Sequence, residues 1–353
     1  MIDKIMEMDN KLKIGLIFNQ KPEYTGNENN APVDMYAEWD GLETINAVAG
    51  ALKNGLNGIG RREVVLIEAD NKMFNKLIKE KPDIVFNIAE GFNGASREAQ
   101  VPAILDMLKI PYTGSDPVTL GICLDKQRTK EILSFHNIST PKFFAVSSGK
   151  ELKNTFLPAV VKPIWEGSSK GIINNSLVRT QKELKEQIER IIKDYNQPAL
   201  VEEFIDGREF TVAVIGNDDN VSILPIVEIK LDKLPPGSNK MYSYEAKWVW
   251  DTSDKPLDIF ECPAKLSPKL KKKIEDLCKK AFNVLRCRDW CRIDVRLDKN
   301  GEPYIIELNP LPGVLPNPKD NSCFPKAARS AGISYDEMIN SVLNSAIKRL
   351  GEN

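Results

Sequence analysis

Residues 291–309 read CRIDVRLDKNGEPYIIELN, and this stretch carries the strongest structural signal in the chain. Polar and apolar residues alternate on both sides of an Asn-Gly turn, a dipeptide typical of β-hairpins. Because side chains in a strand alternate between its faces, Arg292 and Asp294 share one face, as do Glu307 and Asn309 on the second strand. The stretch therefore predicts an antiparallel hairpin with one apolar face in the core and one polar face.

The polar face of this hairpin carries two carboxylates and one amide. Pairing of the strands brings Asp294, Glu307 and Asn309 together beside Arg292, and hard oxygen donors of this kind suit Mg²⁺ or Mn²⁺ when phosphate oxygens complete the shell. Carboxylates on a strand more often form a solvated face. Here, however, the opposite face is apolar, and the hairpin leads into a Pro-Leu-Pro-Gly turn at 310–313 that is suited to presenting backbone N–H groups.

A second segment, EGSSKG at 166–171, follows a predicted strand at 159–163. Glycine and serine between two strands allow backbone amides to surround phosphate oxygens, although a loop of this composition is often only flexible. The chain has no G-x-x-x-x-G-K-[ST] motif, and its first strand does not lead into G-x-G-x-x-G. A P-loop protein and a nicotinamide enzyme therefore lose support.

Three lysines occur at strand ends, helix starts or loops: Lys126, Lys162 and Lys247. Since the chain has 49 basic residues, any single lysine is more often a surface residue. Only the combination of lysines, glycine loop and carboxylate hairpin predicts a polyphosphate site.

The composition bounds the class of protein. The chain has 353 residues, enough for two or three domains at about 150 residues each. Its 49 basic and 50 acidic residues nearly cancel, which argues against a nucleic-acid-binding surface. The apolar runs fall short of the ~18–20 residues of a membrane-spanning helix, and residues 1–10 contain no signal-peptide core. We therefore expect a soluble cytoplasmic protein.

Cysteine and histidine exclude several chemistries. Six cysteines occur without a C-x-x-C pair, and the single histidine, His136, leaves no zinc constellation. We expect scattered reduced thiols rather than a metal pair at Cys287 and Cys291. His136 is expected at the surface or as a helix cap. A hydrolase with a histidine general base is therefore disfavoured.

The first 110 residues alternate between short apolar strands and amphipathic helices, a pattern that predicts a parallel sheet covered on both faces. Asp40 is the candidate N-cap of the first helix. The expected strands there are 12–18, 64–67 and 83–88, and the expected helices are 40–53, 73–78 and 97–108. Farther on we expect helices at 126–135, 181–194, 266–285 and 335–350, strands at 142–146, 159–163 and 199–204, a strand-rich region at 208–231, and a long loop at 232–262.

Taken together, these segments resemble the ATP-grasp superfamily and, within it, the D-alanine–D-alanine ligases. The resemblance implies an α/β ATP-grasp fold with a parallel α/β substrate domain at 11–119, a central ATP-grasp subdomain at 120–204 and a C-terminal catalytic domain at 205–353. The matching stretches are IPYTGS at 110–115, LDK at 124–126, VKP at 161–163, EGSS at 166–169, VEEFIDGRE at 201–209, YEAK at 244–247, RID at 292–294, ELN at 307–309 and PG at 312–313.

The resemblance implies an ATP- and Mg²⁺-dependent ligase that joins a carboxylate to an amine through an acylphosphate. Such chemistry needs oxyanion stabilisation but no histidine or cysteine nucleophile. The ATP-binding residues implied are Lys126, Lys162, Glu166, Ser169, Glu202, Glu203, Phe204, Ile205 and Glu209. The implied metal ligands are Asp294, Glu307 and Asn309. The residues implied at the reacting atoms are Arg292, Ser168, Gly313 and Lys247.

The sequence departs from this family on the amino-acid side. The first strand ends in FNQ at 18–20, without the family's glycine-rich turn and its substrate-orienting glutamate, for which Glu38 and Glu43 are candidate replacements. The segment NIAEG at 87–91 stands where the family has a His-Gly loop. Trp248 replaces the usual tyrosine and can donate from its indole but cannot accept in the same way. The ATP half therefore looks retained and the amino-acid half rewritten.

Three readings follow. The first is a carboxylate–amine ligase, for D-alanine or for another amino acid or small peptide. The second is an ATP-binding protein without ligation, and the third is a small-molecule kinase that stops after phosphoryl transfer. Arg292 beside the carboxylates favours the ligase, because binding alone would not need it there. The family is often homodimeric through the first domain, so a homodimer is the analogous expectation.

Overall fold

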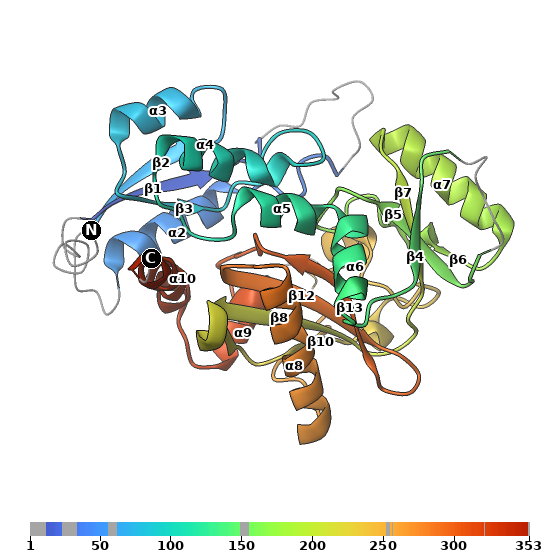
Figure 1. Ribbon diagram of the computed structural model, residues 1–353. Coiled ribbons are helices and arrows are strands. Elements are labelled where there is room, and N and C mark those ends of the chain that lie inside the picture. The colour runs from blue at the N-terminus through green and yellow to red at the C-terminus, as the bar shows by residue number, and fades with distance from the viewer. Residues whose placement is uncertain are drawn as a thin grey trace.

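The computed structural model describes residues 12–22, 34–55, 62–148, 155–251, 255, 257–320 and 322–351. Within these residues the chain forms three β-sheets with helices packed against them (Figure 1). The first sheet is parallel, as the alternation of strands and helices predicted. The other two are antiparallel, and side chains from both line one cleft.

The parallel sheet has the strand order β2-β1-β3. Ile14 and Leu16 of β1 pack toward α2 and α10, whereas Ile17 packs toward α3 and α4, so both faces are covered. The last helix of the chain thus completes one face of the first sheet. The elements are β1 (Lys13–Phe18), α2 (Leu42–Asn54), β2 (Glu63–Glu68), α3 (Met73–Glu80), β3 (Ile84–Asn87), η3 (Arg97–Ala99), α4 (Gln100–Leu108) and α10 (Tyr335–Gly351).

The central sheet has the order β4-β7-β5-β6. Leu184, Ile188 and Ile191 on one face of α7 bury against Val161 and Val201, and each such side chain contributes about 1.5–3 kcal/mol. α7 covers the outer side of this sheet (Figure 1). The elements are α5 (Pro117–Leu124), α6 (Lys126–Phe135), β4 (Phe143–Val146), β5 (Ala159–Pro163), η5 (Asn174–Ser176), β6 (Leu177–Val178), α7 (Gln181–Tyr195) and β7 (Ala199–Glu203).

The C-terminal sheet has the order β11-β10-β8-β12-β13, with β9 paired to β8. Ile293 and Val295 pack with α8, and Trp290 packs on the other face with Phe324 of α9. The hairpin predicted from residues 291–309 is confirmed as β12 and β13. The elements are β8 (Glu209–Gly216), η6 (Asp218–Asn220), β9 (Ser222–Ile223), β10 (Val227–Ile229), η7 (Leu231–Lys233), η8 (Ala246–Trp250), β11 (Phe260–Glu261), α8 (Pro268–Val284), β12 (Asp289–Leu297), β13 (Pro303–Asn309) and α9 (Cys323–Ser330).

Some local expectations were wrong. Asp40 does not cap the first helix, which begins at Leu42 with Gly41 as N-cap, because the Asp40 side chain lines the cleft instead. Two α-helices were missed, α5 and α9, and the predicted loop at 232–262 contains the short helix η8 (Ala246–Trp250) and the strand β11. Helix α5 carried a usable signal: the Asp116 carboxylate accepts a hydrogen bond from the backbone N–H of Thr119, and proline follows the cap directly.

The thiols are free, but three of them are not scattered. Cys123, Cys287 and Cys291 are buried and hydrogen-bonded together, and these bonds lower the pKa of Cys287 to about 5. His136 is exposed and forms the C-cap of α6, as expected. None of the helices in the described part of the chain has the length and apolar character needed to span a bilayer.

Candidate active site

The cleft between the two antiparallel sheets collects nearly all of the residues predicted from sequence. The space in it that atoms leave free is about 1390 Å³, part of which is open to solvent. A smaller cavity continues from it and adds Lys126 and Asn309. Of the predicted residues, only Glu166 lies just outside both linings. Those on the main cleft are Lys162, Ser168, Ser169, Glu202, Glu203, Phe204, Ile205, Glu209, Lys247, Arg292, Asp294, Glu307 and Gly313.

The register of the hairpin brings its polar side chains together. Arg292 lies opposite Asn309, and Asp294 lies opposite Glu307. Arg292 Nη2 is 3.0 Å from Asp294 Oδ2 and 3.9 Å from Glu307 Oε1, and Asn309 Nδ2 is 3.3 Å from Asp294 Oδ2. One guanidinium therefore faces two carboxylates and one amide, as the alternation predicted.

The charges around this face shift the pKa values of the two carboxylates in opposite directions. Burial opposes ionisation of Glu307, but Lys126, Lys162 and Arg292 outweigh it and lower its pKa to about 2. For Asp294, burial and the charge of Glu307 dominate over Arg292, so its pKa is raised. Glu307 is thus held as an anion beneath the lysines.

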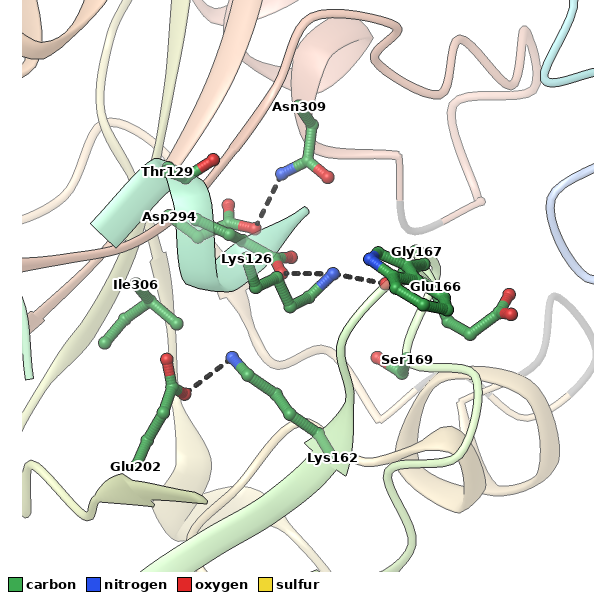
Figure 2. A network of polar contacts seen from close by, with 12 residues as sticks. Lys126, Thr129, Lys162, Glu166, Gly167, Ser169, Glu202, Asp294, Ile306 and Asn309 are labelled. Carbon is green, nitrogen blue, oxygen red and sulfur yellow. Dashed lines mark hydrogen bonds and ion pairs between the residues drawn. The ribbon is translucent and has the colours of Figure 1, made fainter. Parts of the chain in front are cut away.

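Two of the three predicted lysines, Lys126 and Lys162, point into the cleft from different elements (Figure 2). Lys162 Nζ lies 2.6 Å from the carboxylate of Glu202, and Lys126 Nζ lies 3.7 Å from Glu307 and donates to the backbone carbonyl of Glu166. Lys130 was missed by sequence reasoning. It lies one helical turn after Lys126, is 1% exposed, and is also 2.6 Å from Glu202.

The opposite end of the cleft is bounded by the strand end and loop at 202–209. The guanidinium of Arg296 lies 4.7 Å from the centre of the Phe204 ring and 3.4 Å from Glu209. Burial raises the pKa of Glu209 despite this partner. Arg296 was also missed, although it continues the alternation of Arg292 and Asp294 and so shares their face.

The Gly-Ser loop is tied to the N-terminal domain through Glu38. The carboxylate of Glu38 accepts hydrogen bonds from the backbone N–H of Gly167 at 2.6 Å, from Arg97 at 2.8 Å and from Lys170 at 3.3 Å. A Cβ at position 167 would lie 2.5 Å from the carboxylate, so glycine permits this approach. Of the two candidates for the substrate-orienting glutamate, Glu38 lines both the cleft and the smaller cavity, whereas Glu43 is exposed on α2 and lines neither.

A segment containing Lys247 and Trp248 covers the loop from the other side. The indole Nε1 of Trp248 donates to the Ser168 carbonyl at 3.2 Å, and Ser169 Oγ donates to the Tyr242 carbonyl at 3.1 Å. Burial, and then the charge of Arg292, lowers the pKa of Lys247 to about 8. The tryptophan therefore bonds to main chain rather than to the serine side chain.

The donor set fits a divalent cation only together with a ligand that supplies further oxygens. Within the described ranges, no group of three or more His, Cys, Asp or Glu side chains is arranged to hold a metal ion. The hairpin offers two carboxylates and one amide oxygen, all hard donors. Since Mg²⁺ prefers six oxygens, phosphate oxygens and water would supply the remainder.

Comparison with known proteins shows which fold has these features. A crystal structure of the D-alanine–D-alanine ligase from Bacillus anthracis complexed with ATP superposes with a TM-score of 0.70, covers 97% of this chain and 99% of its own, and is 23% identical. A fold of this kind around a cleft with lysines and a carboxylate hairpin defines an ATP-grasp protein, which confirms the expected fold.

Sequence comparison identifies the family within this class. The family model described as D-ala D-ala ligase C-terminus matches residues 133–344. The D-alanine–D-alanine ligase of Pelotomaculum thermopropionicum is 31% identical over 88% of this chain and 93% of its own length. The uncharacterized protein y4sG of Sinorhizobium fredii is 36% identical over 81% of this chain and 84% of its own length. The chain belongs to the D-alanine–D-alanine ligase family.

Proposed function

We propose that the protein uses ATP to join a carboxylate to an amine through an acylphosphate. The observation that carries this proposal is the cluster of Arg292, Asp294, Glu307 and Asn309 on one face of a hairpin, inside a cleft that also receives Lys162. Family membership supports the same reaction class, because two of the three named relatives are D-alanine–D-alanine ligases, one of them in complex with ATP.

In this proposal the central sheet and the 202–209 segment bind ATP. Lys126 and Lys162 neutralise its phosphates, and the backbone at 166–169 surrounds them. The nucleoside is bound by the next segment. The backbone at 202–205 forms hydrogen bonds with the edge of the adenine ring, and Glu209 accepts hydrogen bonds from the ribose hydroxyls. The ion pairs that Glu202 makes with Lys130 and Lys162 keep the latter ammonium in place.

The hairpin is the proposed metal and oxyanion site. Asp294, Glu307 and Asn309 would hold Mg²⁺, which when bound neutralises charge on the phosphate oxygens. Arg292 lies beside these ligands and faces the open cleft. The backbone N–H of Gly313 donates to no described residue, so it is available to a developing oxyanion.

The chemistry proceeds in two steps. A carboxylate oxygen of the first substrate attacks the γ-phosphorus of ATP, the bond to the bridging oxygen breaks, and ADP leaves. The amine nitrogen of the second substrate then attacks the acyl carbon, and the tetrahedral intermediate expels phosphate while the nitrogen loses a proton. Both steps place negative charge on oxygen, where Arg292, Lys247 and the Gly313 N–H stabilise it.

The test is phosphate release with ATP, Mg²⁺ and pairs of D- and L-amino acids and dipeptides, followed by mass spectrometry. Phosphate release that requires two substrates, with a new amide of the summed mass minus water, supports the proposal. A stable phosphorylated product from one substrate would indicate a kinase instead. Nucleotide binding without turnover for any pair would leave only a binding protein and overturn the proposal.

The proposal includes location and assembly. We place the enzyme in the cytoplasm, where ATP and free amino acids are available, and as a homodimer through its first domain by analogy with the family. Light scattering coupled to gel filtration tests the second point. A mass equal to one chain across a tenfold concentration range would refute it.

A further inference from the structure

The smaller cavity beside the proposed reaction centre is lined by carboxylates that the ATP-dependent chemistry does not use. We call Asp40, Glu90 and Glu98 the acidic pocket: Glu90 and Glu98 line this cavity, and Asp40 joins Glu90 in the small cavity next to it. Asp40 precedes α2, Glu90 follows β3, and Glu98 lies in η3. All three stand beyond the carboxyl ends of the parallel strands, where ligands of such sheets bind.

The carboxylates of the acidic pocket lack partners. Glu98 is 8% exposed, yet its carboxylate makes no hydrogen bond or ion pair with any residue that the structure describes. The same holds for the side chains of Glu90 and Asp40, which are half-buried, within those ranges. The charges of Arg97 and Lys126 act on Glu98 without forming an ion pair with it. Their neighbour Glu38 is the opposite case, because Arg97 and Lys170 both pair with it. Buried carboxylates are ordinarily paired, so Glu98 in particular lacks the partner that its burial calls for.

Burial has the expected electrostatic effect on the pocket. It raises the pKa of Glu98 to about 7 and that of Asp40 to about 7, and it raises the pKa of Glu90 well above its usual range, with the charge of Glu98 adding to the effect. A bound cation would favour the ionised carboxylates, which would then release any protons that they carry.

The position of the acidic pocket links it to the substrates. Glu90 and Glu98 line the same cavity as Arg292, Lys247 and Gly313. Glu90 and Asp40 also line a further small cavity that has Gly313 in common. A substrate whose reacting atoms lie against the Gly313 N–H can therefore extend its far end into the acidic pocket.

We propose that the acidic pocket binds a second positively charged group of a substrate, so that the enzyme ligates a diamino acid in preference to a neutral amino acid. This rests on the proposed ligase function. A neutral amino acid brings a single ammonium, whereas the pocket offers as many as three carboxylates. A side-chain ammonium in the cavity that Glu90 and Glu98 share would pair with these carboxylates, while a methyl group there would leave Glu98 buried without a partner.

The experiment compares isosteric amine and alkyl side chains in the full-length enzyme. Phosphate release is measured with ATP, Mg²⁺ and both enantiomers of ornithine and lysine against norvaline and norleucine, each alone and paired with alanine. We expect kcat/KM to be at least tenfold higher for the diamino acids. Glu98→Gln and Glu90→Gln should lower that value about tenfold or more for the diamino acids and change it less than threefold for the alkyl analogues.

Controls separate a local effect from misfolding. Glu68→Gln, at an exposed position on β2 of the same sheet, should leave both substrate classes unchanged. Calorimetric titration of ornithine and norvaline, in the presence of Mg²⁺ and a non-hydrolysable ATP analogue, gives binding without turnover. The thermal transition of each variant confirms that it is folded.

The outcomes distinguish this inference from the proposed function. Equal use and equal binding of diamino and alkyl substrates, or equal losses for both in Glu98→Gln, would overturn the acidic pocket and leave the ligase intact. Charge-selective binding that Glu98→Gln abolishes, without turnover of any pair, would uphold the pocket and overturn the ligase. Neither binding nor turnover with any amino acid would overturn both.

Discussion

Replacing Glu98 with glutamine should stabilise the substrate-free protein at alkaline pH. The carboxyl group is buried without a partner among the described residues, and its pKa lies at about 7 rather than 4.5. This difference corresponds to about 3 kcal/mol of penalty on the ionised form in the folded state. Glutamine occupies nearly the same volume without carrying that charge.

The pH dependence follows from the direction of the pKa change. Since the folded state binds the proton more tightly, the penalty is absent below pH 4.5, grows as the pH rises to 7, and is constant above that. The variant should therefore exceed the wild type by as much as about 3 kcal/mol in unfolding free energy at pH 8, and by little at pH 4.5.

Urea unfolding without substrate, at pH 4.5 and pH 8, measures both differences. Glu68→Gln supplies the control, because this exposed side chain has no burial penalty to relieve. If Glu98→Gln were as stable as the wild type at pH 8, or less stable, Glu98 would have a cationic partner in the free protein. The reasoning behind the acidic pocket would then be wrong.

Three further predictions concern the cleft. Glu307→Gln should reduce phosphate release about 10²–10³-fold while circular dichroism stays unchanged, and retained turnover would remove the metal assignment. Trp248→Tyr loses the indole bond to the Ser168 carbonyl and should change the ratio of kcat/KM between substrates; an unaltered ratio would separate this residue from specificity. Arg97→Met should destabilise the protein by about 3–5 kcal/mol in thermal or urea unfolding, because it strips a buried carboxylate of its main partner; adding Glu38→Gln should restore part of that loss, and additive losses would argue against the pair.

Much of the site was predictable because its signals are local. A strand alternates its side chains with a period of two, so the common face of Arg292 and Asp294 follows from spacing alone. The Asn-Gly turn adds the pairing with Glu307 and Asn309. The helices of the first domain were predictable in the same way, from the spacing of their apolar residues.

The contacts that sequence reasoning missed join segments far apart in the chain. Glu38 is 129 positions before Gly167, and no periodicity connects a carboxylate on one domain with a backbone N–H on another. In the sequence, Lys130 resembles a surface lysine. In the structure, Glu202 of β7 lies against it. α10 covers the first sheet only because the chain returns to it after more than two hundred residues.

By itself, then, the amino-acid order determined most of the secondary structure, the polar face of the hairpin and the class of chemistry, since each depends on neighbours a few residues apart. Only the tertiary structure decided which carboxylates form ion pairs and which do not. Glu38 and Glu98 are the same residue type, but in the described chain Glu38 forms ion pairs with Arg97 and Lys170, whereas Glu98 forms none, because charge pairing depends on distance in space.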